Sequence, residues 1–230
     1  ILDQSKDWAK IISEELSEQI LEDGAHFELS PMYHSVILED LIDIFNIFKV
    51  FQVSSGRRHL QLIESIEAKI SVMLIWLEEM IHPDEEISFF NDSAIGIAHT
   101  FKDLKNYALT SGIELKEKTI SEDLSHLKDL GYIRLNLQDA IFLLDVAHVG
   151  PDYIPGHAHA DTLSFEASIH EKRLIVNSGT SCYGLNKERH RQRSTKSHST
   201  VEIDNKNSSE VWSSFRVAKR AYPKNLEINC

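Results

Sequence analysis

Residues 132–144 read Tyr-Ile-Arg-Leu-Asn-Leu-Gln-Asp-Ala-Ile-Phe-Leu-Leu, and here the chain changes from helical to strand-like patterning. Two short apolar runs, Tyr132–Leu135 and Ala140–Leu144, are separated by residues 136–139, which is the pattern of a β-hairpin. Further strands are expected at residues 162–169, 173–176, 199–203 and 214–218. This part of the chain therefore predicts an antiparallel β domain.

The residues before the hairpin carry apolar side chains at helical spacing. Helices are expected after Asp7, from Pro31, from about Arg58 to Ile81, and from a cap at residues 91–93 to Gly112. A short capped segment is expected at residues 121–130. The predicted fold class is α+β, with a helical domain over residues 1–115 and an antiparallel β domain over residues 116–230.

The composition is that of a folded globular domain or pair of domains. The chain has 230 residues, 42% hydrophobic and 26% charged. No run of 18 apolar residues is present, so no membrane span is expected. The chain begins at Ile1 without an initiator Met and ends at Cys230, which favours an internal fragment of a longer protein. Cys182 and Cys230 are expected as free thiols rather than as a disulfide.

The charge is unevenly distributed. Residues 1–150 carry 12 basic and 27 acidic side chains, a net charge of −15, whereas residues 151–230 carry 12 and 9, a net charge of +3. This is either an acidic, well-solvated helical half joined to a neutral half, or positive charge gathered beside the histidines to receive an anionic ligand. A nucleic acid is a poor candidate, because an acidic chain repels it and no basic and aromatic interleaving is present.

The β part contains several histidines close together in the sequence. Gly-His-Ala-His-Ala-Asp at residues 156–161 places His157 and His159 two positions apart, on one side of an expected strand. They could be a metal pair, a catalytic histidine beside a ligand, or two histidines in ordinary hydrogen bonds. With Asn177 and His198 following, a zinc site is predicted, in which His159, His198 and the carbonyl oxygen of Asn177 are ligands. Asn is a weaker ligand than Asp.

Three other segments contain candidate residues. Tyr183, in a Gly- and Ser-rich loop, is either a surface aromatic or an acid–base phenol. The basic run 187–196 is either a solvated loop or a binding site for substrate carboxylate or sulfate, with Arg189 and Arg193 as candidates. Residues 24–34 either form a capping loop or bring further site residues to the N-terminal end of a helix. Beside Tyr33, the candidates in this segment are Glu28 and His34 for substrate binding.

Together these motifs resemble those of the heparinase II/III-type polysaccharide lyases. The resemblance rests on segments in the same order along nearly the whole chain. They are residues 23–34, 156–165, 176–184, 193–200 and 215–217. It implies part of an (α/α) toroid in residues 1–115, followed by an antiparallel β-sandwich in residues 116–230.

The resemblance also implies a reaction and residue roles. The family cleaves uronic-acid-containing polysaccharides by β-elimination, in which a base removes the C5 proton and an acid protonates the leaving O4. It implies that Tyr33 is a base or acid, His157 the catalytic histidine and Tyr183 the second phenol. His159, Asn177 and His198 fall at structural metal positions, where the family usually has Asp in place of Asn177.

In the family, an Asn/His pair of residues neutralises the substrate carboxylate. The resemblance places this pair on an earlier toroid helix outside this sequence. The chain alone is therefore expected to be inactive. The resemblance also favours a periplasmic or secreted location. Heparan-type, alginate-type and bacterial surface polysaccharides all remain open as substrates.

Two alternatives come from other function classes. The His157-x-His159-x-Asp161 pattern also begins the metallo-β-lactamase motif of metal-dependent hydrolases, which has a further His where this chain has Thr162. That motif belongs to an α/β sandwich rather than behind a long helical part. The second alternative is a non-catalytic glycan-binding relative, motivated by Asn177.

Overall fold

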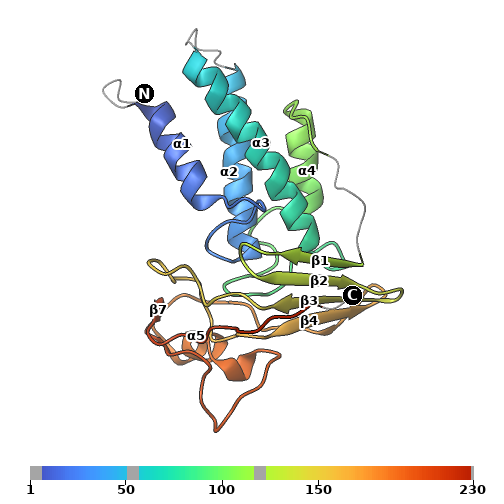
Figure 1. Ribbon diagram of the computed structural model, residues 1–230, viewed down its shortest axis with the longest axis vertical. Helices are drawn as coiled ribbons and strands as arrows, with labels where there is room; N and C mark the ends of the chain where they lie inside the picture. Colours follow the sequence, from blue (N-terminus) through green and yellow to red (C-terminus); the bar gives the residue numbers. More distant parts are fainter. Residues whose placement is uncertain (1–6, 51–56, 117–122, 229–230) are drawn as a thin grey trace.

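A layer of helices stands over an antiparallel sheet in the computed structural model, which describes residues 7–50, 57–116 and 123–228. Figure 1 shows the long helices side by side above the strands, with α5 beyond the sheet. The helices are α1 Trp8–Gln19, α2 Pro31–Val50, α3 Arg57–Glu79 and α4 Phe101–Thr110, followed by the short α5 Lys187–Gln192 and a 3-10 turn, Thr195–Ser197. The predicted α+β class is confirmed.

The beginnings of the first helices follow their predicted caps. Asp7 accepts a hydrogen bond from the Lys10 backbone N–H, and Pro31 is the first residue of α2. The fourth helix begins at Phe101, where Thr100 is the N-cap, so the predicted start at residues 91–93 was wrong. Asn91 has a positive φ of 56°, and its side-chain amide donates to distant groups instead of capping a helix.

The β part is a five-stranded antiparallel sheet in the order β1 to β5. Its strands are β1 Leu124–Leu127, β2 Tyr132–Asn136, β3 Ala140–Asp145, β4 Phe165–Ile169 and β5 Lys172–Ile175. The predicted hairpin is β2–β3, with Ile133 opposite Leu144. A second sheet pairs β6 Val211–Trp212 with β7 Arg216–Val217.

Two sequence-based expectations for the β part differ from the structure, and a third lies outside the described residues. The segment predicted as a short capped element at 121–130 contributes strand β1, which pairs with β2; residues 121 and 122 lie outside the described part. Residues 199–203 are not a strand: the Ser199 N–H donates to the side chain of Asn177, and the Ser199 carbonyl oxygen accepts a single bond from Phe165 of β4 at 3.3 Å. The domain boundary at 115/116 lies beside residues 117–122, also outside the described part, and stays a prediction.

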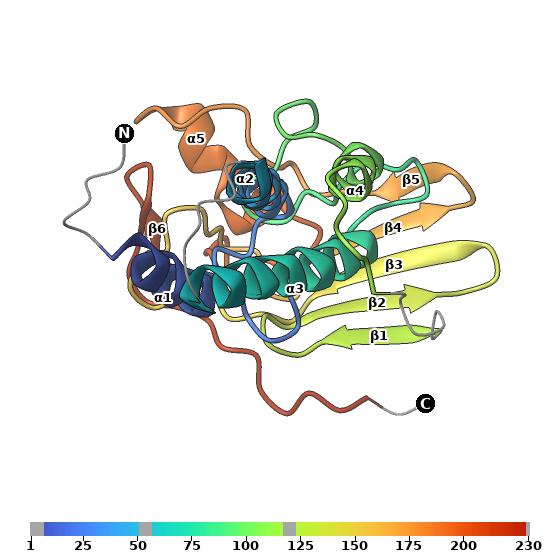
Figure 2. The same ribbon diagram turned by 90° about the horizontal axis from the view of Figure 1, so that it is seen from above.

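Two buried clusters hold the layers together. The first fills the space between the helices, with Leu38, Ile42, Phe45 and Ile70 among its members. The second joins the end of α3 to the sheet, and its members include Trp76, Phe90, Tyr132 and Leu143. Seen from above, α3 reaches the strands at its C-terminal end (Figure 2).

A buried polar network joins the segment after α3 to strands β4 and β5. His82 contacts Glu166 at 2.8 Å and Ser168 at 2.7 Å, and both His82 and Glu166 are buried. Arg173 donates two hydrogen bonds to Asp84. Because buried charges need partners, this network fixes the helical part on the sheet at one position. Among the described residues, no helix is long and apolar enough to cross a membrane.

Replacing Trp76 with Ala tests the junction between the layers. Trp76 is fully buried, so its loss leaves a cavity, and the free energy of unfolding is expected to fall by about 3–5 kcal/mol. Urea unfolding followed by circular dichroism measures the change. The control is Leu60→Ala on the same helix, where the side chain is 62% exposed and the expected change is below about 0.5 kcal/mol. An equal decrease in the free energy of unfolding for the two variants would contradict the assignment of Trp76 to the core between helices and sheet.

Candidate active site

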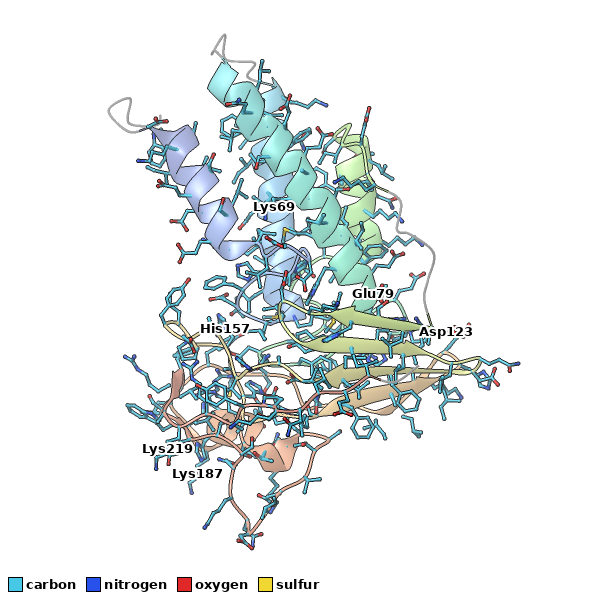
Figure 3. All side chains as sticks on the ribbon, viewed as in Figure 1. Lys69, Glu79, Asp123, His157, Lys187 and Lys219 are labelled. Atoms are coloured by element: carbon cyan, nitrogen blue, oxygen red, sulfur yellow. The ribbon has the colours of Figure 1, made fainter. Side chains whose placement is uncertain are left out.

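The candidate site lies where loops of the helical part meet loops of the β part. Figure 3 shows His157 below the helices and beside the sheet. The segment between β3 and β4 carries His157 and His159, and residues 91–92 run against it. The Asp92 backbone N–H donates to the His157 carbonyl oxygen at 3.2 Å, and the His159 N–H donates to Asn91 Oδ1 at 3.1 Å. The two histidines therefore lie in a loop, and the predicted strand was wrong.

Asp92 is the centre of this junction. Its Oδ2 lies 3.0 Å from His157 Nδ1 and its Oδ1 lies 2.8 Å from His159 Nε2. The Arg189 guanidinium donates to both oxygens. Burial alone would raise the pKa of this carboxyl, but the hydrogen bonds from His157, His159 and Arg189 hold the pKa well below its usual range. Asp92 is therefore an ionised, buried carboxylate.

Tyr33, His157 and Tyr183 come from three distant segments and meet at one point. Tyr33, in the first turn of α2, stacks on His157 with ring centroids 3.8 Å apart. Its hydroxyl donates to the Tyr183 hydroxyl at 3.1 Å. The side chain of His157 is 17% exposed and Tyr183 is 37% exposed, so the cluster reaches solvent. The three predicted catalytic residues thus form one accessible group.

The loop that carries Tyr183 is held by backbone contact with the segment after α3. The Thr180 N–H donates to the Ser93 carbonyl oxygen at 3.0 Å. Gly179 has a φ of +57°, and a Cβ there would lie 2.3 Å from the same oxygen, so a side chain at this position would separate the two loops. Tyr183 then stacks on Phe215, with ring centroids 6.0 Å apart.

Burial raises the pKa of the Tyr183 phenol, and the negative charge of Asp92 raises it further. Tyr183 therefore keeps its proton at neutral pH. A protonated phenol beside an imidazole is an arrangement suited to general acid–base chemistry.

A second cluster, formed by His159, Asp161 and His198, lies behind His157. Ligand atoms of its three buried side chains lie within 4.8 Å of one another. His159 Nδ1 is 3.2 Å from His198 Nε2, and Asp161 Oδ2 is buried with no hydrogen-bond partner among the described residues. Two imidazoles and a carboxylate are ligands that divalent metals accept, and the unpartnered oxygen fits such an ion. This cluster could hold a metal ion.

Asp161 enters this cluster, although the sequence-based prediction named Asn177 as the third ligand. The Oδ1 atom of Asn177 accepts a hydrogen bond from the Ser199 N–H at 3.0 Å, and its Nδ2 donates to Ser164 at 3.4 Å. Asn177 is thus engaged in holding two backbone segments together. A further ligand role for Asn177 stays a prediction.

Three of the residues predicted to bind substrate are buried. The side chain of Arg189 pairs with Asp92, and the Arg193 guanidinium donates to backbone carbonyl oxygens, including that of Ala158 at 3.0 Å. His34 lies between the His26 N–H and the Met73 carbonyl oxygen. In this structure all three side chains hold other parts of the site, and substrate binding by them stays a prediction.

Glu28 and Arg216 are two charged residues beside the cluster. Glu28 Oε2 lies 3.7 Å from His157 Nε2, and burial raises the pKa of its carboxyl. Arg216 is exposed and lines a cavity of about 370 Å³ together with Tyr153, Gly156 and Phe215. Substrate binding by Glu28 stays a prediction, whereas Arg216 was not among the predicted residues.

Asp92 and Asp161 were not assigned to the site from the sequence. Residues 91–93 were interpreted as a helix cap, because Asn-Asp-Ser before an apolar stretch is typical of one. The exposed Ile95 and Ile97 give that stretch no buried helical face, and the interrupted periodicity before Phe101 could have indicated a loop. Asp161 was assigned only to the alternative hydrolase motif and not to the predicted metal site.

Comparisons with known proteins agree with the fold. The heparinase II/III N-terminal family model matches residues 2–111, and the heparinase II/III-like C-terminal model matches residues 119–229. A heparin-sulfate lyase of Bacteroides stercoris is 26% identical over 217 residues, which are 86% of this chain and 31% of that protein.

Solved structures show the same arrangement. A heparan sulfate lyase of Pedobacter heparinus has a TM-score of 0.63 at 20% identity, covering 89% of this chain and 35% of that chain. A heparinase III structure has a TM-score of 0.66 at 20% identity, covering 89% and 37%. The chain spans about a third of the length of these relatives.

The stability of the junction is expected to fall in acid. Burial, then the neighbouring His26, lower the pKa of His34 from 6.5 to about 3, although the Met73 carbonyl acts in the opposite direction. Between pH 6.5 and pH 3 the unfolded chain binds a proton that the folded chain rejects. The free energy of unfolding therefore decreases as the pH falls, by up to about 1.4 kcal/mol per pH unit from this group.

Urea unfolding of the wild type and His34→Gln at several pH values between 7 and 4 measures this contribution. The variant is expected to have a shallower slope, and His170→Gln, at an exposed histidine, an unchanged one. If the free energy of unfolding had the same dependence on pH in the wild type and in His34→Gln, the lowered pKa of His34 would be contradicted.

Proposed function

The chain belongs to the heparinase II/III-like family, and on this basis we propose that the whole protein is a polysaccharide lyase that cleaves a uronate-containing acidic polysaccharide by β-elimination. The observation that carries this proposal is the contact among Tyr33, His157 and Tyr183. Their rings and hydroxyls meet within hydrogen-bond and stacking distance at an accessible surface. A base and an acid side by side are what removal of the C5 proton and departure of O4 require.

His157 is the base in this mechanism. Asp92 is ionised and can only accept, so His157 donates through Nδ1–H and keeps a lone pair on Nε2. Nε2 lies 3.7 Å from Glu28 Oε2, and the His157 side chain is 17% exposed. It removes the proton from C5, and the electrons of that C–H bond form the C4=C5 double bond as the bond to O4 breaks.

Tyr183 is the acid. Its raised pKa keeps the phenol protonated, and the Tyr33 hydroxyl occupies a lone pair of the Tyr183 oxygen rather than its proton. The Tyr183 O–H is therefore free to donate to the departing O4. Tyr33 orients this phenol and, through its stack on His157, fixes the separation between base and acid.

Arg216, in the cavity beside the cluster, binds the negatively charged groups of the substrate. Phe215 and Tyr153 give this cavity two exposed aromatic faces for sugar rings, and Arg216 gives it a cation for a carboxylate or sulfate. The relatives named as heparin-sulfate and heparan sulfate lyases make a sulfated uronate polymer the first substrate class to test. A periplasmic or secreted location remains a prediction of the family resemblance.

The His159–Asp161–His198 cluster holds a structural divalent cation, for which zinc fits the donor set. When bound, the cation fixes the positions of its ligands and takes no part in the elimination. The hydrolase alternative is not favoured, because His157 faces Asp92 and Tyr33 and lies outside this cluster.

Ultraviolet absorbance of the C4=C5 product tests the lyase proposal with the whole protein and a panel of heparan sulfate, alginate and uncharged polymers. His157→Ala and Tyr183→Phe are each expected to lower kcat by about 10²–10⁴-fold. Tyr222→Phe, at an exposed tyrosine on the surface, is the matched control and keeps its activity. Cleavage without the chromophore would indicate hydrolysis, and binding without turnover would indicate a non-catalytic glycan-binding protein.

Metal analysis tests the cation proposal. The whole protein is expected to contain one zinc ion per chain, and His198→Ala is expected to lose it together with several degrees of thermal stability. His170→Ala, at an exposed histidine, keeps the ion. Full retention of zinc by His198→Ala would contradict this assignment.

A further inference from the structure

We propose that Asp92 is a positioning residue that fixes the tautomers of both His157 and His159, so that one carboxylate orients the reacting histidine and the metal-binding histidine. This inference rests on the proposed function. It assigns a role to a residue of the helical part, in the segment between α3 and α4, that acts through the two histidines and does not touch the substrate.

The two oxygens of Asp92 serve different rings. Oδ2 faces His157 Nδ1 at 3.0 Å, and Oδ1 faces His159 Nε2 at 2.8 Å. The carboxylate has no proton to give, so each imidazole is the donor. A neutral histidine that donates from one nitrogen keeps a lone pair on the other.

The two rings are therefore set in opposite tautomers by one anion. His157 carries its proton on Nδ1, which leaves the lone pair on Nε2, 3.7 Å from Glu28 Oε2. His159 carries its proton on Nε2, which leaves Nδ1 open toward His198 Nε2, 3.2 Å away. A histidine that donates to a carboxylate and presents its other nitrogen to a metal is a recurrent arrangement in metal sites.

Asp92 cannot turn away from this position. Arg189 donates to both of its oxygens from the other side, and the Arg189 side chain is itself fully buried and donates to the Ser214 carbonyl at 3.0 Å. The backbone adds a second restraint, because the Asp92 N–H donates to the His157 carbonyl oxygen. The carboxylate is thus fixed relative to the loop whose histidines it orients.

Arg189 extends this link to the phenol. Its guanidinium carbon lies 5.2 Å from the centre of the Tyr183 ring and 5.4 Å from that of Phe215. The base and the acid of the proposed reaction therefore rest on one buried pair, Asp92 with Arg189. A change at Asp92 is expected to disturb catalysis more than substrate binding.

The test compares Asp92→Asn with the wild type in the whole protein. Asn keeps the shape of Asp, but its NH₂ group is a donor facing one of the imidazoles, so one histidine must change tautomer. We expect kcat for the eliminated product to fall by about 10²–10⁴-fold, the range seen when a histidine loses its orienting carboxylate, while KM changes by less than about threefold. Zinc content is also expected to fall.

Glu79→Gln is the matched control, because Glu79 is another buried carboxylate with an arginine partner, Arg134 at 3.8 Å. It is expected to lower thermal stability and leave kcat within about threefold. Unchanged kcat and zinc content in Asp92→Asn would overturn the proposal, as would an equal loss of kcat in Glu79→Gln. If His157→Ala is fully active, the proposed function fails separately.

A measurement on the wild type covers the case in which Asp92→Asn does not fold. Nitrogen NMR of the whole protein with ¹⁵N-labelled histidine reports which ring nitrogen carries the proton, and the His157→Gln variant identifies the His157 signals. A proton on Nδ1 is expected. A proton on Nε2 of His157 in the neutral ring would overturn the proposal without any change at Asp92.

Discussion

The buried pair of Asp92 and Arg189 is the interaction on which the site depends. Removing two charges from water costs several kcal/mol for each ion, and the attraction between them compensates only where hydrogen bonds use the remaining groups. Here the carboxylate accepts from His157, His159 and the guanidinium. Removing one partner of such a pair costs about 3–5 kcal/mol, because the other charge is left alone. The pair therefore specifies one arrangement of the loops around it.

The pair can form only when the helical part and the β part meet correctly. Asp92 comes from the segment after α3, and Arg189 from α5 beyond the sheet. The apolar cluster around Trp76 and the polar network of His82 with Glu166 bring these segments together. Packing and hydrogen bonding thus set the distance between the layers, and the site is formed at their boundary.

Much of the fold could be predicted from the sequence, because local patterns decide it. Pro31 began a helix, and the apolar runs around residues 132–144 formed a hairpin. Tyr33, His157 and Tyr183 were named from motifs and do meet. Asp92 was interpreted as part of a helix cap, and Arg189 as a residue that binds substrate, so their mutual pairing was not foreseen. The reason is that a short polar segment does not tell from its own sequence which distant charge it will meet.

A crystal structure of the whole protein with a bound uronate oligosaccharide tests the central claim most directly, namely that the substrate is attacked at the Tyr33–His157–Tyr183 cluster. The account predicts a sugar C5 within about 4 Å of His157 Nε2, with the glycosidic oxygen beside the Tyr183 hydroxyl. A sugar bound in the separate cavity of about 580 Å³ lined by Phe27, His126 and His148, with nothing at His157, would contradict it.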